Sequence, residues 1–183
     1  MDTNLITTIE NILTNKKIKL TKLLSSAFNI NCLKIVTANN EKFVVKYYET
    51  KKNDFNAIQA ETKNLLFFNK EKLNLFPKVV GHNESFLIIK YFENNKKKPN
   101  KINSQFINII TELHSKSSEK FGFYFDTQIG GMRQPNDFDQ NWAVFFAEKR
   151  LNVIFETICK INPMPKKINQ NLENLIRSIN EKI

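Results

Sequence analysis

Two side chains of opposite charge, fifteen positions apart in the first half of the sequence, could together hold an anion. Lys46 ends the run Phe43-Val44-Val45, which is typical of a β-strand, and Glu61 falls in a segment with helical spacing. A strand fixes the lysine stem, and a helix carboxylate can hold the ammonium where it meets the α- and β-phosphate oxygens of a nucleotide. An alternative stays open, in which a strand lysine lies on apolar surface beside a surface glutamate.

Other residue types offer less chemistry. The two cysteines, Cys32 and Cys159, and the two histidines, His82 and His114, are not spaced as a metal-ligand set. Two distant cysteines also form no disulfide framework, which is typical of a reducing compartment. We therefore expect no metal ligands among these residues.

The charge balance is basic, with 28 Lys and Arg against 18 Asp and Glu, a net charge of +10. Only three of the basic residues are arginines, and the lysines are spread along the chain, which favours solvated lysines over recognition of nucleic acid. No apolar run is long enough to predict a membrane span, and the first ten residues lack the basic start of a signal peptide. The sequence predicts a cytoplasmic protein without a membrane partner.

The elements that must position Lys46 and Glu61 follow from periodicity. Apolar residues at helical spacing predict an opening helix, and Asn39-Asn40 predicts a hairpin turn between two strands. A mixed, mostly antiparallel front half precedes a helical back half, so the predicted fold class is α+β. The predicted strands are 18–24, 32–37, 42–48, 79–80 and 86–92, and the predicted helices are 54–73, 102–115, 141–161 and 167–183.

A set of short motifs occurs in order in the second half of the chain. They are Phe121-Gly122-Phe123, Ile129-Gly130-Gly131, Gln134-Pro135-Asn136, Asn141-Trp142, Phe145-Phe146 and Arg150-Leu151. With Lys46 and Glu61, this set resembles the fructosamine kinase (ketosamine-3-kinase) family, which is similar to aminoglycoside phosphotransferases and has a protein-kinase-like fold. The resemblance implies a small nucleotide-binding lobe at residues 1–93, a connection at 94–101, and a partial helical lobe at 102–183.

The resemblance also implies site residues on the nucleotide side. Lys46 corresponds to the nucleotide lysine and Glu61 to its helix partner, while Lys90-Tyr91 corresponds to the segment whose backbone contacts adenine. The phosphate turn falls at residues 25–31, where Phe28 and Asn29 stand in place of glycines, so close backbone approach to phosphate is harder here. ATP is the implied cofactor, and Mg²⁺ is expected for the family.

On the acceptor side, the resemblance implies that Gln134, Asn136 and Trp142 border the substrate, a glycated amine or related small molecule. Arg150 is expected to anchor its helix by pairing with a carboxylate. The family's His-Gly-Asp catalytic loop and its later Asp-Pro metal ligand do not occur in this sequence. We therefore expect no catalytic residue and no Mg²⁺ ligand here, and a truncated kinase that is inactive alone.

The alternative to a truncated enzyme is a kinase remnant that binds nucleotide without transfer, or one that a second polypeptide completes. An incomplete helical lobe would leave apolar side chains partly exposed and favour self-association. The residues concerned are Phe155, Ile158, Leu172 and Leu175.

Overall fold

The computed structural model describes residues 3–50, 55–71, 76–94, 97 and 103–182. The chain divides into two compact units, Met1–Ser115 and Lys116–Ile183. This division falls after the helix at the end of the first unit, later than the connection predicted at residues 94–101, most of which lies outside the described residues. The lobe boundary stays a prediction, and each unit is described below by itself.

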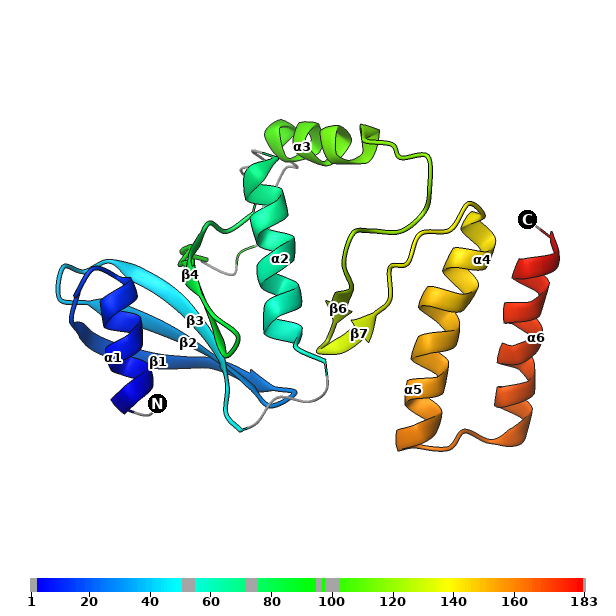
Figure 1. Cartoon of the computed structure of the whole chain (residues 1–183), viewed down its shortest axis with the longest axis horizontal. Coiled ribbons are helices and arrows are strands. Elements are labelled where there is room, and N and C mark those ends of the chain that lie inside the picture. Colours follow the sequence, from blue (N-terminus) through cyan, green and yellow to red (C-terminus); the bar gives the residue numbers. More distant parts are fainter. Residues whose placement is uncertain (1–2, 51–54, 72–75, 95–96, 98–102, 183) are drawn as a thin grey trace. The chain divides into compact units, whose positions relative to one another are not determined.

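The first unit contains a five-stranded sheet in the order β1-β2-β3-β5-β4, with every neighbouring pair antiparallel (Figure 1). The predicted α+β class is confirmed. The strands are β1 (Ile18–Ala27), β2 (Ile30–Thr37), β3 (Lys42–Tyr48), β4 (Val79–His82) and β5 (Phe86–Lys90), and the helices are α1 (Thr3–Ile12), α2 (Ala57–Lys70) and α3 (Ser104–Ser115).

Apolar side chains on both faces of the sheet build the core of this unit. Successive strand residues point to opposite faces, so Val45 and Ile88 pack with Ile9 of α1 in one cluster. Leu87 and Ile89 pack with Ile58 of α2 in the other. The sheet is therefore the middle layer between α1 and α2, and Lys46, one residue after Val45, lies on the α2 face.

Two tight turns set the register of the first three strands. The β1-β2 turn consists of Phe28 and Asn29, both with positive φ (52° and 63°), as a two-residue hairpin of the primed type requires. Asn40, with φ of 63°, lies between β2 and β3, which confirms the hairpin predicted there. The helix predicted at 54–73 is observed as α2. Its predicted ends, at 54 and 72–73, lie outside the described residues.

The second unit begins with a small hairpin, β6 (Thr127–Ile129) and β7 (Met132–Gln134), in a stretch where the sequence predicts only loop. Gly130 and Gly131 form its turn with positive φ (54° and 83°). The helix predicted at 141–161 is observed as three segments: α4 (Trp142–Phe146), the π-helical turn η1 (Ala147–Asn152) and α5 (Val153–Ile161). Periodicity did not reveal the π-turn, because one extra residue in a turn leaves the apolar pattern on either side intact.

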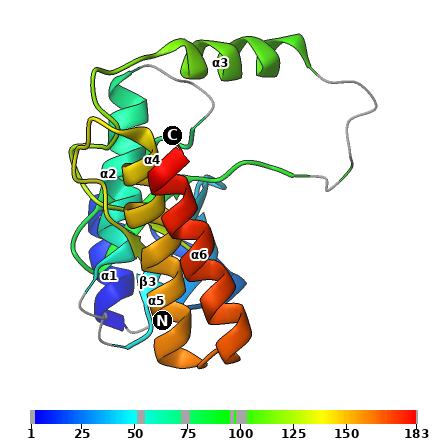
Figure 2. The ribbon, with the colours of Figure 1, turned by 90° about the vertical axis from the view of Figure 1, so that its right-hand side faces the viewer.

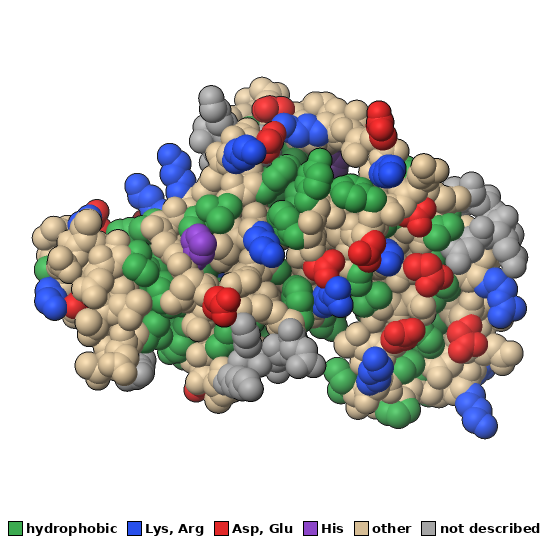
Figure 3. Space-filling view, in the orientation of Figure 1, with side chains coloured by type: hydrophobic (Ala, Val, Ile, Leu, Met, Phe, Trp, Pro, Cys, Tyr) green, Lys and Arg blue, Asp and Glu red, His purple; other side chains and the backbone are tan. Residues whose placement is uncertain are grey.

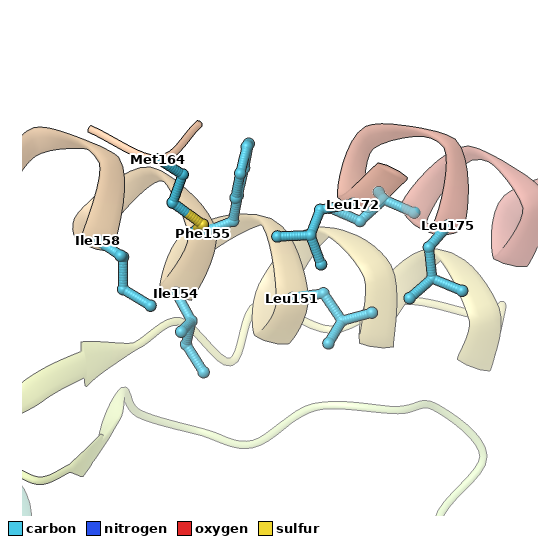
Figure 4. Close-up of a pocket in the computed structure, with 8 residues that line it drawn as sticks. Leu151, Ile154, Phe155, Ile158, Met164, Leu172 and Leu175 are labelled. Atoms are coloured by element: carbon cyan, nitrogen blue, oxygen red, sulfur yellow. The ribbon is translucent and has the colours of Figure 1, made fainter. Parts of the chain in front are cut away.

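The last helix, α6 (Lys166–Lys182), runs beside α5, as Figures 1 and 2 show. An apolar groove of about 180 Å³ lies between them (Figure 4). Ile158 and Leu175 on its walls are 40% and 50% exposed, which confirms the predicted partial exposure. The groove is lined by Leu151, Ile154, Phe155, Ile158, Met164, Leu172, Leu175 and Ile176.

Candidate nucleotide and acceptor sites

The predicted ion pair between β3 and α2 is formed. Lys46 Nζ lies 2.5 Å from Glu61 Oε1, and the two side chains are only 26% and 24% exposed. Asn56 caps α2 by accepting from the Gln59 amide at 3.0 Å, and it donates to the Glu84 carbonyl at 2.8 Å, which anchors the helix start. A cap fixed at the helix start sets the rotation of α2, and this rotation brings the carboxylate to the lysine.

Cys32 lies on β2 directly opposite Lys46, and Ser25 of β1 lies opposite Cys32. Burial raises the pKa of the Cys32 thiol, and the positive charge of Lys46 only partly opposes this. The thiol is therefore neutral at physiological pH, and Lys46 has a neutral neighbour on one side and Glu61 on the other. The positive charge of Lys46 thus has one close anionic partner in this cluster.

The turn at Phe28 and Asn29 stands at the same end of the sheet as Lys46, because Ile30 pairs with Tyr48. Asn29 accepts hydrogen bonds from the Glu49 amide through its carbonyl, at 3.0 Å, and from the Thr50 amide through its side chain, at 3.3 Å. The Phe28 side chain is 66% exposed at the tip. The structure therefore brings the predicted phosphate turn and the lysine together, with side chains where glycine would leave bare backbone.

Lys90 and Tyr91 lie beside the start of β3, at the opposite end of that strand from Lys46. The Lys90 amide donates to the Lys78 carbonyl and the Tyr91 amide to the Lys42 carbonyl, each at 3.2 Å. The ammonium of Lys34 lies 4.1 Å from the centre of the Tyr91 ring. Since both amides are used inside the sheet, an adenine contact from this segment must use carbonyl oxygens or a later amide.

Asn136, predicted to contact the acceptor, is buried at 3% exposure. Its side-chain amide donates to the Phe125 carbonyl and to Thr127 Oγ1, both at 3.0 Å, and its Oδ1 accepts from Arg150. Its backbone amide donates to Asp126 Oδ1 at 3.2 Å. Because these groups are all engaged internally, the structure corrects the expectation of a direct substrate contact: Asn136 holds its own loop.

Gln134 and Trp142 are more accessible. Gln134 is half-buried, and its Oε1 accepts from Thr127 Oγ1 at 3.2 Å. Trp142 is 44% exposed and stacks on Phe146 with ring centres 5.1 Å apart. Its position follows from Asn141, which caps α4 through the Ala143 amide at 2.8 Å. Of the three predicted acceptor residues, Trp142 presents the most free surface.

Among the described residues, no group of three His, Cys, Asp or Glu side chains could hold a metal ion. None of the described helices has the length and apolar character needed to cross a membrane. On the face drawn in Figure 3, Lys and Arg side chains stand mostly singly among acidic ones.

The fold and the ion pair together define a class of protein. An antiparallel sheet whose strand lysine is paired with a helix glutamate is the protein-kinase-like arrangement. A fructosamine-3-kinase candidate from Thermobifida fusca aligns with 99% of the chain at a TM-score of 0.77 and 15% identity. A second candidate, from Haemophilus somnus, aligns with 97% of the chain at a TM-score of 0.73 and 21% identity. The gentamicin–APH(2")-IIa complex aligns with 97% of the chain at a TM-score of 0.54 and 18% identity.

Sequence comparison then gives the family. Residues 1–183 match the family model described as fructosamine kinase. In an alignment that covers 34% of this chain and 30% of the relative, the chain is 31% identical to a ketoamine kinase candidate of Pasteurella multocida. The chain belongs to the fructosamine kinase family, and it spans 62% and 61% of the length of the two fructosamine-3-kinase candidates whose structures it matches.

Proposed function

We propose that this chain supplies the nucleotide-binding part of an ATP-dependent kinase that phosphorylates a sugar hydroxyl of glycated amines, free or protein-bound. The observation that carries the proposal is the Lys46–Glu61 ion pair, formed across two elements and about three-quarters buried. Membership of the fructosamine kinase family supports the choice of acceptor. An acceptor of this kind is compatible with a cytoplasmic protein. It also favours a kinase over a protein that binds nucleic acid.

In this proposal Glu61 holds the ammonium of Lys46 toward the α- and β-phosphates of ATP, where it offsets their charge. The turn at Phe28 and Asn29 covers the phosphates. Lys42, to which Tyr91 is bonded, lies four residues from Lys46 along β3, roughly 13 Å at the rise of a strand. That span leaves room for ribose and base between the lysine and the backbone carbonyls of residues 90 and 91.

Phosphoryl transfer itself needs an oriented nucleophile and metal charge neutralisation. The family's catalytic loop does not occur in this sequence, and no metal-binding group is found among the described residues. We propose that the chain binds ATP but does not transfer its phosphate alone. A kinase remnant completed by a second polypeptide is the second candidate, which the exposed apolar groove between α5 and α6 favours.

The test is ATP affinity in three variants, measured by calorimetry. Lys46→Met removes the phosphate contact and Glu61→Gln releases the lysine. Lys22→Met is the matched control, because Lys22 is an exposed lysine on β1 of the same sheet. We expect Lys46→Met to weaken ATP binding at least about tenfold, which corresponds to about 1.4 kcal/mol, and Glu61→Gln to weaken it somewhat less.

The control variant should bind ATP as the parent chain does. Equal losses in Lys46→Met and Lys22→Met would mean that ATP responds only to net charge, and retained affinity in Lys46→Met would remove the nucleotide assignment. Circular dichroism of each variant checks that the sheet is intact.

A further inference from the structure

Arg150 lies in the π-turn η1 and is bonded to uncharged groups. Its Nη1 donates to the Pro135 carbonyl at 2.7 Å and to the Lys149 carbonyl at 2.9 Å, and its Nη2 donates to Asn136 Oδ1. Its Cζ lies 4.7 Å from the centre of the Phe145 ring. The carboxylate partner expected from the sequence is not found among the described residues, where the bonds of Arg150 reach oxygens of the peptide backbone and of an amide.

Burial lowers the pKa of the Arg150 guanidinium, since no nearby charge offsets the loss of water. A half-buried cation without an anionic partner is a costly choice if its task is only to fill space. Its planar fork is suited instead to holding two acceptors in a fixed relative geometry. Two of the three acceptors of Arg150, Pro135 and Asn136, are consecutive residues of one loop.

The π-turn gives this loop a second tie. Lys149, the residue before Arg150, lies with its Nζ 2.9 Å from Asp137 Oδ2. Neighbouring residues of η1 therefore bind neighbouring residues of the loop. Helical turns of the π type are rare, occur mostly as single turns inside α-helices, and are frequent at functional sites.

The tied loop leads directly to Trp142. Asp139 exchanges two backbone hydrogen bonds with Phe121, both 2.8 Å, and its carboxylate accepts from the Asn141 amide at 2.7 Å. Asn141 then caps α4, of which Trp142 is the first residue. Asn136, Asp139 and Asn141 on the path to Trp142 are thus each held by hydrogen bonds, and Arg150 binds the start of that path.

We propose that Arg150 is a positioning residue, which clamps the loop of Pro135 and Asn136 to the π-turn and thereby sets the positions of Gln134 and Trp142. The inference rests on the proposed function in that it assigns these two side chains to the acceptor. Its consequence is that binding of a ketosamine depends on Arg150, although Arg150 itself does not touch the ketosamine. Binding of ATP, which we place in the first unit, does not depend on it.

Trp142 is the only tryptophan of the chain, so its fluorescence reports the clamp directly. Acrylamide quenching is measured for the full chain, for Arg150→Gln and for Arg150→Lys. Lys160→Gln is the matched control, because it removes the same charge from an exposed side chain of α5 in the same unit, outside the contacts that hold the loop. Dissociation constants for fructosyl-glycine and for ATP are measured on the same samples, with circular dichroism to confirm the helices.

In Arg150→Gln we expect the quenching constant of Trp142 to change about twofold and the ketosamine affinity to fall about tenfold, with ATP affinity kept. Arg150→Lys should fall between this variant and the parent, since an ammonium lacks the fork that reaches both acceptors. Lys160→Gln should behave as the parent chain.

Equal behaviour of Arg150→Gln and Lys160→Gln would overturn the proposal, and so would a loss of ATP affinity as large as the loss of ketosamine affinity. If the parent chain binds no ketosamine, the acceptor part of the proposed function fails. The quenching constants would then decide alone whether Arg150 positions Trp142.

Discussion

Replacing Gly122 by alanine should destabilise the second unit severely. Gly122 has a φ of +140°, where side-chain-bearing residues rarely occur. A Cβ there would lie 2.8 Å from the Asn136 carbonyl oxygen and 2.9 Å from Phe138 Cα. Both atoms belong to the backbone of the loop that Arg150 holds, so neither can rotate away.

The magnitude combines two contributions. A residue forced into a sparsely populated backbone region costs about 1–3 kcal/mol. Adding a methyl group to a closely packed site costs about 1–3 kcal/mol more. We expect Gly122→Ala to lower the free energy of unfolding of the second unit by about 3 kcal/mol, a large share of the stability that so small a unit can have.

Gly81→Ala is the matched control. A Cβ at Gly81 would lie 2.3 Å from Ile12 Cγ2, a shorter approach than any at Gly122, and the next atom after Ile12 is Ile88 Cδ1 at 3.7 Å. Ile12 is the last residue of α1 and is 37% exposed, so its side chain can turn toward solvent. We expect a cost of about 1 kcal/mol, at the low end for added methyl groups.

The assay is urea unfolding followed by the fluorescence of Trp142, which reports the second unit, and by circular dichroism, which reports both. With a slope of about 1 kcal/mol per molar urea for a small unit, Gly122→Ala should move the fluorescence midpoint by about 3 M or remove the folded baseline. Gly81→Ala should leave the fluorescence transition in place. A Gly122→Ala midpoint within about 0.5 M of the parent would refute the reasoning, since backbone atoms would then have yielded at little cost.

Two further outcomes are expected. In Glu10→Gln, the free energy of unfolding should become less dependent on pH. Hydrogen bonds from Lys17 and from the Ile18 amide lower the pKa of Glu10 below its usual 4.5. The stabilisation by the Glu10 carboxylate is therefore present above pH 4.5 and is lost as the pH falls through the folded-state pKa. Urea midpoints from neutral to acidic pH check this, and equal slopes in both proteins would contradict it. In Leu175→Lys, a charge in the apolar groove should reduce self-association in sedimentation velocity, and Lys167→Glu on the same helix, away from the groove lining, should not.

The sheet was the part of the fold most readily predicted from sequence. The strand at 42–48 was predicted with its observed bounds, because a short run of β-branched and aromatic residues after a turn dipeptide is typical of a strand. The end of β1 was predicted three residues early. A phenylalanine at position 28 does not predict a turn, because phenylalanine does not favour a positive φ. The pairing of β1 with β2 imposes this φ on Phe28.

The candidate site, too, could be predicted from the sequence only in part. Lys46 and Glu61 could be paired from their elements, because a strand and the helix that follows it have few ways to pack. The motif around Asn136 predicts a substrate residue, since nothing in its immediate neighbours shows that its amide donates to Phe125 and Thr127, eleven and nine positions away. Hydrogen bonds between loop segments have no periodicity, and the role of Arg150 was hidden for the same reason.

The π-turn also constrains the length of the chain, and not only its composition. In an ordinary α-helix each residue advances the helix by about 100°. Deleting one residue from 147–152 would preserve a continuous helix but rotate α5 by that angle relative to α4, which would turn Ile154 and Ile158 away from α6. Evolution can therefore exchange side chains along this helix more freely than it can add or remove a single residue.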